Sequence, residues 1–259
     1  MNIPLFHVDA FTGRVFAGNP AAVCPLETWP DDATLQQIAA ENNLSEPAFF
    51  APEGDALRLR WFTPEVEVDL CGHATLASAF VIMNYLEPGR AEVRFLSASG
   101  ELRVEKSGDL YTLDFPSRPP EPCSVPKEIA AAMGKAPVDL LASRDYLAVY
   151  ESEDDVRGLV PDMEALKSLD RFAVIATAPG SSVDFVSRFF APAQGIAEDP
   201  VTGSAHCTLT PYWSRRLGKT QLHALQVSRR GGELWCEDRG ARVHISGKAA
   251  LFSRGLICL

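Results

Sequence analysis

The chain has 259 residues, of which 46% are hydrophobic, and its formal net charge is −10 at pH 7. This length allows one large core or two domains of ordinary size, whereas the acidic balance argues against a nucleic acid or an anionic membrane as partner. No run is long and apolar enough for a membrane span, the N-terminus lacks the pattern of a signal peptide, and the six cysteines show no pairing pattern. We therefore expect a cytoplasmic protein with reduced thiols.

Short strands and one helix are expected at the start of the chain. Alternation predicts strands at residues 5–11 and 21–24, separated by the sharp turn Gly18-Asn19-Pro20. Asp31 or Asp32 can cap a helix that runs to about residue 42. The pair Asn42-Asn43 is typical of a left-handed helix stop.

The next run, Leu44-Ser45-Glu46-Pro47-Ala48-Phe49-Phe50, places one carboxylate in an apolar context. Pro47 favours an extended conformation for Glu46, and a strand here would set Leu44, Glu46, Ala48 and Phe50 on one face. Two interpretations are open. Burial without a cation would raise the pKa of the Glu46 carboxyl toward neutrality, which suits a group that gives and takes a proton. Alternatively, the charge protects an edge strand from aggregation.

Two stretches of the chain follow the same plan. FTPEVEVDLCGHATLASAFVIMN (residues 62–84) and FFAPAQGIAEDPVTGSAHCTLTPYW (residues 189–213) both run from Phe-x-Pro through an acidic loop to Gly-His-Ala or Gly-Ser-Ala at the start of a helix. The first N–H groups of a helix have no partner within it and favour an anion. We therefore predict two similar halves, whose helix starts at Gly72-His73 and Gly203-Ser204 hold a carboxylate in one cleft.

Strands outnumber helices in the rest of the chain. Further strands are expected at residues 57–62, 91–96, 101–106, 110–115, 146–150, 172–177, 187–190, 225–228, 234–236 and 242–246, and helices at 74–86, 162–169, after the 203–204 turn as far as 218, and in a short segment ending near 134. Many of these strands are joined by short turns, so the sheets are expected to be mixed or largely antiparallel and the class α+β.

The Pro-rich segment 116–122 predicts a linker. It separates an expected first domain, residues 1–116, from a second, residues 117–259, which meet near residues 116–126. The last residues of the chain can cross back to the first domain. No dinucleotide or phosphate-binding glycine motif follows a strand, so no organic cofactor is expected.

Polar residues at the two helix starts are candidates for a site. His73 follows Gly72 and corresponds to Ser204 in the second copy, so both side chains can face the cleft. The simpler interpretations are a structural histidine and a serine N-cap. Asp199, next to Glu198, is expected in a loop aimed at the second helix start.

Cys71 precedes the first of these helices, where the pKa of a thiol is lowered and the group could act as a nucleophile or base. The matching position of the second copy is Thr202, so no second thiol is expected opposite it. A metal site built from Cys71, His73, His206 and Cys207 is not favoured, because adjacent helical residues point about 100° apart and the spacing matches no usual zinc pattern. We therefore expect no metal.

Four ordered motifs carry a resemblance to a known family: VDAFTGRVFAGNPAAV, ENNLSEPAFF, FTPEVEVDLCGHATL and SRFFAPAQGIAEDPVTGSA. In this order and spacing they resemble the PhzF-like family of phenazine biosynthesis over nearly the whole chain. That family is similar in fold to diaminopimelate epimerase. The resemblance implies two pseudo-symmetric domains, each a curved mixed sheet or barrel wrapped around a central helix, with the active site between them. It also implies isomerase chemistry without metal or organic cofactor, and usually a homodimer.

The resemblance also implies roles for individual residues. The acid–base glutamate of the family falls on Glu46, its cleft histidine on His73, its aspartate on Asp199 and its helix-start serine on Ser204. Apart from the resemblance, Gly72, Gly203 and Asn19 are also expected to bind the substrate or assist its binding. In the phenazine enzyme, a glutamate of this kind moves a proton between carbons of dihydro-hydroxyanthranilate.

The sequence leaves three hypotheses for function. The first is an isomerase that moves a proton on a small carboxylated, amino-bearing metabolite, in phenazine-type or related biosynthesis. The second is an amino-acid epimerase in which Glu46 and Cys71 are opposed bases. A two-thiol racemase is excluded, because the second thiol of the epimerase would fall near Val201. The third is a binding protein of the same fold, against which the intact set of polar residues argues.

Overall fold

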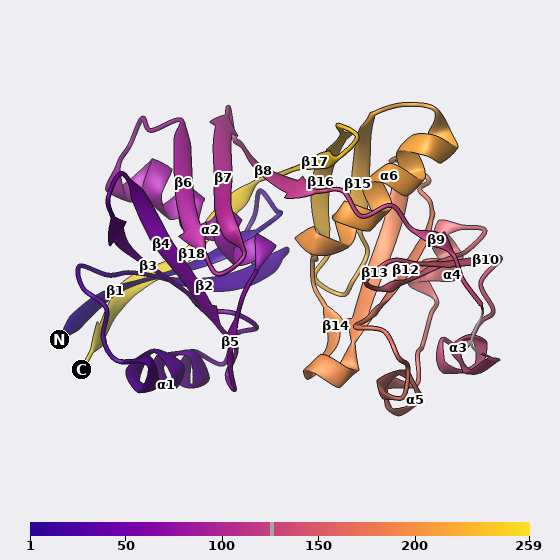
Figure 1. The fold of residues 1–259 in the computed structure, drawn as a ribbon, viewed down its shortest axis with the longest axis horizontal. Coiled ribbons are helices and arrows are strands. Elements are labelled where there is room, and N and C mark those ends of the chain that lie inside the picture. The colour runs from indigo at the N-terminus through magenta and orange to yellow at the C-terminus, as the bar shows by residue number, and fades with distance from the viewer. Residues whose placement is uncertain (125–126) are drawn as a thin grey trace. The chain divides into compact units, whose positions relative to one another are not determined.

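The computed structural model describes residues 1–124 and 127–259, which form two compact units (Figure 1). Unit 1 consists of Met1–Asp114 and Ser246–Leu259, and unit 2 of Phe115–Ile245. The chain therefore passes from unit 1 to unit 2 and returns. Val125 and Pro126, at the end of the segment where the domains were expected to meet, lie outside the described residues.

Unit 1 is a mixed sheet with two helices. Its elements are β1 (Asn2–Ala10), β2 (Asn19–Pro25), α1 (Asp32–Asn42), β3 (Ala48–Glu53), β4 (Ala56–Phe62), β5 (Glu67–Val68), α2 (Gly72–Val81), β6 (Glu92–Ser97), β7 (Gly100–Ser107), most of β8 (Leu110–Pro116) and β18 (Ala249–Cys258). The parallel pairs are β2–β3 and β4–β6. The antiparallel pairs are β1–β18, β1–β2, β3–β4, β6–β7 and β7–β8.

The two helices of unit 1 differ in their surroundings. The Asp31 carboxylate accepts a hydrogen bond from the backbone N–H of Thr34 at 2.8 Å and caps α1, which ends at Asn43 in the left-handed conformation, as predicted. α2 packs against β1, β2, β3 and β18 and is buried from His73 to Val81. It is therefore the central helix of this unit. A π-helical turn, Ile82–Leu86, follows it in place of the predicted further α-helical turn.

The strands of unit 2 alternate between antiparallel and parallel neighbours in the same order as those of unit 1. Its elements are β9 (Glu121–Pro122), α3 (Lys127–Ala132), β10 (Asp139–Ala142), β11 (Tyr146–Val149), α4 (Glu153–Arg157), α5 (Met163–Lys167), β12 (Val174–Pro179), β13 (Phe185–Ala191), β14 (Ile196–Asp199), α6 (His206–Leu217), β15 (Gln221–Gln226), β16 (Gly232–Asp238) and most of β17 (Arg242–Gly247). Here β11–β12 and β13–β15 are the parallel pairs, as β2–β3 and β4–β6 are in unit 1. The predicted α+β class with two similar units is confirmed.

α6 is the counterpart of α2 in unit 2. It packs against β15 and β16, and Trp213 on its buried side stacks on Phe185 of β13 at 5.6 Å between ring centroids. The Trp213 indole N–H donates to Thr177 Oγ1 at 2.9 Å, so the buried ring has a polar partner. These contacts fix α6 against β12, which contains Thr177, and β13, which contains Phe185.

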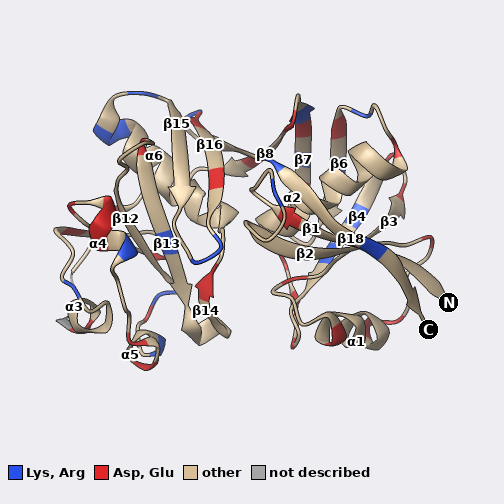
Figure 2. Ribbon diagram, turned by 180° about the vertical axis from the view of Figure 1, so that it is seen from behind, with Lys and Arg blue, Asp and Glu red and all other residues tan. Residues whose placement is uncertain are grey.

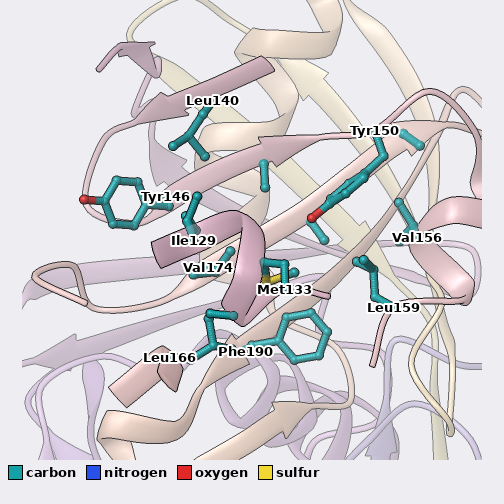
Figure 3. Packing of buried hydrophobic residues seen from close by; sticks show 14 of the residues in the cluster. Ile129, Met133, Leu140, Tyr146, Tyr150, Val156, Leu159, Leu166, Val174 and Phe190 are labelled. Atoms are coloured by element: carbon teal, nitrogen blue, oxygen red, sulfur yellow. The ribbon is translucent and has the colours of Figure 1, made fainter. Parts of the chain in front are cut away.

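On the side of the unit 2 sheet that faces away from α6, buried apolar side chains form a cluster (Figure 3). Ile129 and Met133 come from the segment around α3, Leu166 from α5 and Phe190 from β13, and all are buried. They converge on β10, β11 and β12, so the short helices before β12 cover this face of the sheet.

The C-terminal residues belong to unit 1 because β18 pairs along the whole of β1, from Asn2–Cys258 to Ala10–Ala249. Residues 246–259 of the expected second domain, 117–259, therefore lie in unit 1. Figure 1 shows both termini at the same end of this strand pair. The expected linker at 116–122 is also partly regular, since β8 extends to Pro116 and β9 pairs with β10.

Charged residues of both signs are interspersed on each unit (Figure 2). In the part of the chain that the structure describes, no helix combines the length and the hydropathy needed to cross a bilayer.

Candidate functional site

The start of α2 brings the predicted unit 1 residues together. Cys71 is the N-cap residue in an extended conformation, and its carbonyl accepts hydrogen bonds from the N–H and the hydroxyl of Thr75. The Cys71 side chain makes no capping hydrogen bond to this helix, whose first N–H groups have no partner within the helix itself. The next residue, His73, is 5% exposed and turns its ring toward Glu46.

Glu46 lies just before β3, not within a strand as predicted. The strand begins at Ala48, because Pro47 has no N–H for a ladder and is confined to strand edges. The alternation argument for its side chain was therefore wrong, but the side chain is 16% exposed and close to α2. Its position at the end of a turn, rather than its place on a strand face, directs the carboxylate to the helix start.

Glu46, Cys71 and His73 form a compact cluster of three different functional groups. Glu46 Oε2 lies 3.7 Å from His73 Nε2, and Cys71 Sγ lies 3.5 Å from His73 Nδ1 and 4.0 Å from Nε2. One atom from each of the three side chains can be chosen so that all lie within 4.8 Å of one another. A carboxylate, a thiol and an imidazole thus surround one small volume.

The His73 ring is neutral, because its burial lowers the pKa of the imidazole to about 3. Asn19 Nδ2 lies 3.2 Å from Nδ1. When this amide donates, Nδ1 is the acceptor and the ring proton sits on Nε2, on the side of Glu46. The residue can then offer an N–H toward the carboxylate without carrying a charge.

Gly18 allows Asn19 to reach this ring. Its φ is +66°, and a Cβ at this position would lie 2.2 Å from the carbonyl oxygen of Ala10. Only glycine adopts this close approach without strain. The turn predicted at Gly18-Asn19-Pro20 therefore has a specific purpose, which is to place Asn19 at the first residue of β2.

In unit 2, Asp199 is 7% exposed and is held by a buried network at the end of β14. Its Oδ2 accepts a hydrogen bond from the Thr202 hydroxyl at 2.5 Å. Gln226 donates to the Asp199 carbonyl at 2.8 Å and accepts from the Thr202 N–H at 2.8 Å. The network fixes the turn that leads to Gly203.

Ser204 lies in the 3₁₀ turn Gly203–Ala205 that leads into α6, and Arg144 donates to its hydroxyl at 3.3 Å. Arg144 is held from behind by two hydrogen bonds to Asp145, at 2.9 and 3.0 Å, and Asp145 is 1% exposed. The guanidinium lies 4.5 Å above the ring of Phe172. A fixed cation thus stands beside the second helix start.

Sequence reasoning missed Arg144, Asp145, Gln226 and Phe172. Arg144 could have been found from the order of the strands in the two similar units. It precedes β11, the counterpart of β2, and β2 begins with Asn19, which contacts the other helix start.

Glu198 has a different role from the expected one. The acidic segment before the helix is the strand β14, antiparallel to β13, and not a loop. In it, Glu198 forms two hydrogen bonds with Arg188, at 2.7 and 3.0 Å. The charge of Arg188 balances that of the Glu198 carboxylate. Of the two acidic residues, Asp199 is the one that joins the network around Thr202.

His206 and Cys207, weighed above as metal ligands, lie in unit 2 and are used otherwise. His206 Nδ1 donates to the Thr202 carbonyl at 2.9 Å, and burial lowers the pKa of its ring to about 4. Burial also raises the pKa of the Cys207 thiol to about 11. The group that the structure places with Cys71 and His73 is Glu46. The carboxylate at the two helix starts, and the single cleft that would hold it, remain predictions.

The family model described as phenazine biosynthesis-like protein matches residues 8–255. A Pseudomonas aeruginosa protein named as an uncharacterized isomerase is 52% identical over all 259 residues and the whole of both chains. The human phenazine biosynthesis-like domain-containing protein is 41% identical over 99% of both chains.

Solved structures agree with these matches. The crystal structure of a PhzF family protein of Enterococcus faecalis covers the whole of both chains with a TM-score of 0.98 and 51% identity. A hydroxyproline epimerase of Agrobacterium vitis, at 11% identity and a TM-score of 0.63, shares the fold alone. The match of the family model over nearly the whole chain, the identities and the shared structure lead to one conclusion: this chain belongs to the PhzF-like family of phenazine biosynthesis-like proteins.

Proposed function

We propose that this protein is an isomerase that moves a proton on a small carboxylated, amino-bearing metabolite, with Glu46 as the general acid and base and no metal or organic cofactor in the reaction. The observation that carries the proposal is the position of the Glu46 carboxylate, 3.7 Å from the neutral imidazole of His73 at the start of α2. The isomerase names of the relatives support the reaction class.

The chemistry requires a group that accepts a proton from one carbon and returns it to another. Glu46 suits this task because its side chain is largely shielded from water, at 16% exposed, and is not locked in an ion pair with a charged histidine. A positioned carboxylate of this kind typically contributes about 10²–10⁴-fold in rate. A neutral His73 N–H can point toward the carboxylate from 3.7 Å without pairing with it as a cation.

A second candidate function is an epimerase, in which Cys71 and Glu46 act as opposed bases. The proximity of the Cys71 sulfur to the His73 ring, at 3.5 Å, favours keeping this candidate. An epimerase needs two groups on opposite sides of one carbon, so it predicts that the two half-reactions depend on different residues.

The test is exchange of carbon-bound hydrogen in D₂O, followed by NMR over a panel of amino acids and cyclic amino-carboxylates. Glu46→Gln keeps the shape of the side chain but cannot carry the proton, so exchange and turnover are expected to fall by about 10²–10⁴-fold. Glu41→Gln, on the exposed face of α1, is the matched control and is expected to behave as wild type. Exchange that survives in Glu46→Gln overturns the proposal.

Cys71→Ser separates the two candidates. If Glu46 alone moves the proton, deuterium uptake and product formation change by the same factor in this variant. If Cys71 is the second base, uptake through Glu46 continues while net conversion stops. The ratio of the two rates in Cys71→Ser, compared with the ratio in wild type, therefore distinguishes the isomerase from the epimerase.

A further inference from the structure

Unit 2 contains an arginine whose guanidinium is not fully used by the protein. Arg118 follows β8, and its backbone N–H donates to the Cys207 carbonyl at 2.9 Å, so the residue lies against the first turn of α6. Its side-chain nitrogen Nη1 is buried, and no acceptor among residues 1–124 and 127–259 pairs with it. A buried N–H of this kind is costly to leave without an acceptor, so it calls for an explanation.

A second arginine reaches the same turn from the segment between β10 and β11. Ser143 Oγ lies 2.9 Å from Thr208 Oγ1, which holds this segment along α6. Arg144 uses Nε and Nη2 for Asp145, and Nη2 also for Ser204, while its Nη1 donates to no described residue. Because the Ser204 hydroxyl accepts from Arg144, its own hydrogen can be donated to another acceptor.

Both guanidinium groups act on one side chain. Burial raises the pKa of the Cys207 thiol to about 11, the charges of Arg118 and Arg144 oppose that rise, and the charge of Asp145 adds to it. Asp145 balances Arg144, whereas Arg118 forms no ion pair within the described part of the chain. Two guanidinium groups and one carboxylate leave an excess of one positive charge around Cys207.

We propose that Arg118 and Arg144 bind a carboxylate of the ligand and thereby select carboxylated molecules over neutral ones of the same shape. The unused N–H groups of the two arginines and the Ser204 hydroxyl are all donors, which complements the two oxygens of a carboxylate. A carboxylate brings one negative charge, as the excess requires, whereas a phosphate group brings about 1.5–2. That this carboxylate belongs to the substrate rests on the proposed function, but its binding does not.

Benzoate and benzamide are the probes, because they have nearly the same shape and differ in charge. Each is titrated into the full chain and followed by ligand-observed NMR. We expect benzoate to bind at least about 10-fold more tightly than benzamide, since one charge-assisted hydrogen bond is worth a factor of about 10–100. Equal binding of the two probes, or no binding of benzoate, overturns the proposal.

Variants of Arg118 assign the site. Arg118→Met is expected to weaken benzoate binding by about 10–100-fold, and Arg118→Lys, which keeps the charge but not the planar fork, is expected to recover part of the loss. Arg215→Met changes an exposed arginine in the last turn of α6 and is the matched control, expected to bind as wild type. Equal affinities of the two methionine variants, with both folded by circular dichroism, contradict the site.

Arg144 is tested together with Asp145, because Arg144→Met alone would leave a buried carboxylate without its cation. The double variant Arg144→Met/Asp145→Asn removes one charge of each sign, so the net charge does not change. We expect it to bind benzoate at least about 10-fold more weakly than wild type, since the guanidinium itself holds the carboxylate. Wild-type affinity in this variant contradicts the role of Arg144.

The role in substrate binding is measured separately, in the deuterium-exchange assay. Arg118→Met is expected to raise the KM of a carboxylated substrate by about 10–100-fold and to leave kcat nearly unchanged, because this residue binds the substrate and does not move the proton. If benzoate binds as expected but no substrate exchanges, the carboxylate site stands and the proposed isomerase fails. If exchange in Arg118→Met keeps the KM of wild type, the role in substrate binding is refuted and the isomerase stands.

Discussion

The starts of α2 and α6 occupy equivalent places in two units with the same strand pairing, yet their polar groups differ in kind. At α2, a neutral His73 lies beside Glu46 and Cys71 without a fixed cation among the contacts described above. At α6, Ser204 lies beside Arg144, which is clamped by a buried Asp145. The first arrangement suits a group that changes its protonation, and the second suits one that holds a charge in place.

The comparison teaches that a repeated fold can supply the same backbone feature, a helix N-terminus, while the residues before the neighbouring strands decide its chemistry. Asn19 begins β2 and contacts His73, whereas Arg144 precedes β11 and contacts Ser204.

The largest expected effect is on the pH dependence of stability. Burial lowers the pKa of His73 to about 3 and that of His206 to about 4, from 6.5 in an unperturbed ring. Below pH 6.5 these histidines bind protons in the unfolded chain but stay neutral in the folded protein. The free energy of unfolding is therefore at its full value above pH 6.5, and it decreases as the pH falls toward the pKa values of the folded state. At about 1.4 kcal/mol per unit, His206 accounts for roughly 3 kcal/mol by pH 4.

His206→Asn keeps a nitrogen that can donate to Thr202 and removes the titration. Urea unfolding at about pH 7 and about pH 4.5 is expected to show a smaller acid loss in this variant than in wild type, and the same holds for His73→Asn. The loss attributable to His73 continues to lower pH than that of His206. An acid loss as steep in both variants as in wild type would contradict the neutral, buried state of the rings.

The next effect tests how unit 1 places Asn19. Gly18→Ala is expected to lower the free energy of unfolding by at least about 2 kcal/mol, because a left-handed backbone costs a side chain about 1–2 kcal/mol and the new Cβ would meet the Ala10 carbonyl. Gly54→Ala is the control, since its φ of +60° is similar and its Cβ would meet nothing within 4 Å. Equal losses in the two variants, by chemical denaturation, would show that the close approach is unimportant.

The smallest effect is expected for Ser204, in unit 2. Ser204→Ala removes one long hydrogen bond of Arg144, which Asp145 still holds, so we expect a loss of about 0.5–1 kcal/mol. Arg144→Ala leaves the buried Asp145 carboxylate without its cation and is expected to cost about 2–3 kcal/mol. Thermal unfolding of the two variants side by side measures the difference. If the serine variant is as unstable as the arginine variant, the guanidinium is not clamped from behind.

The sequence by itself determined the class, the family and most of the elements. Caps and left-handed stops gave α1 and its end at Asn43, and the repeated Phe-x-Pro…Gly plan located α2 and α6. These features depend on local backbone chemistry, which a few neighbouring residues specify. The same local signals named Glu46, Cys71, His73, Asp199 and Ser204 as candidates.

Only the tertiary structure decided which side chains meet. Glu46 reaches His73 from a turn and not from a strand face, Glu198 pairs with Arg188, and Arg144 reaches Ser204 across 60 residues. The C-terminal strand β18 returns to β1 because hydrogen-bonded pairing over its length places it there. Such contacts depend on the pairing of strands that are distant in the chain, and on bulges and turns that shift side chains by one residue, so no periodicity within a short segment contains them.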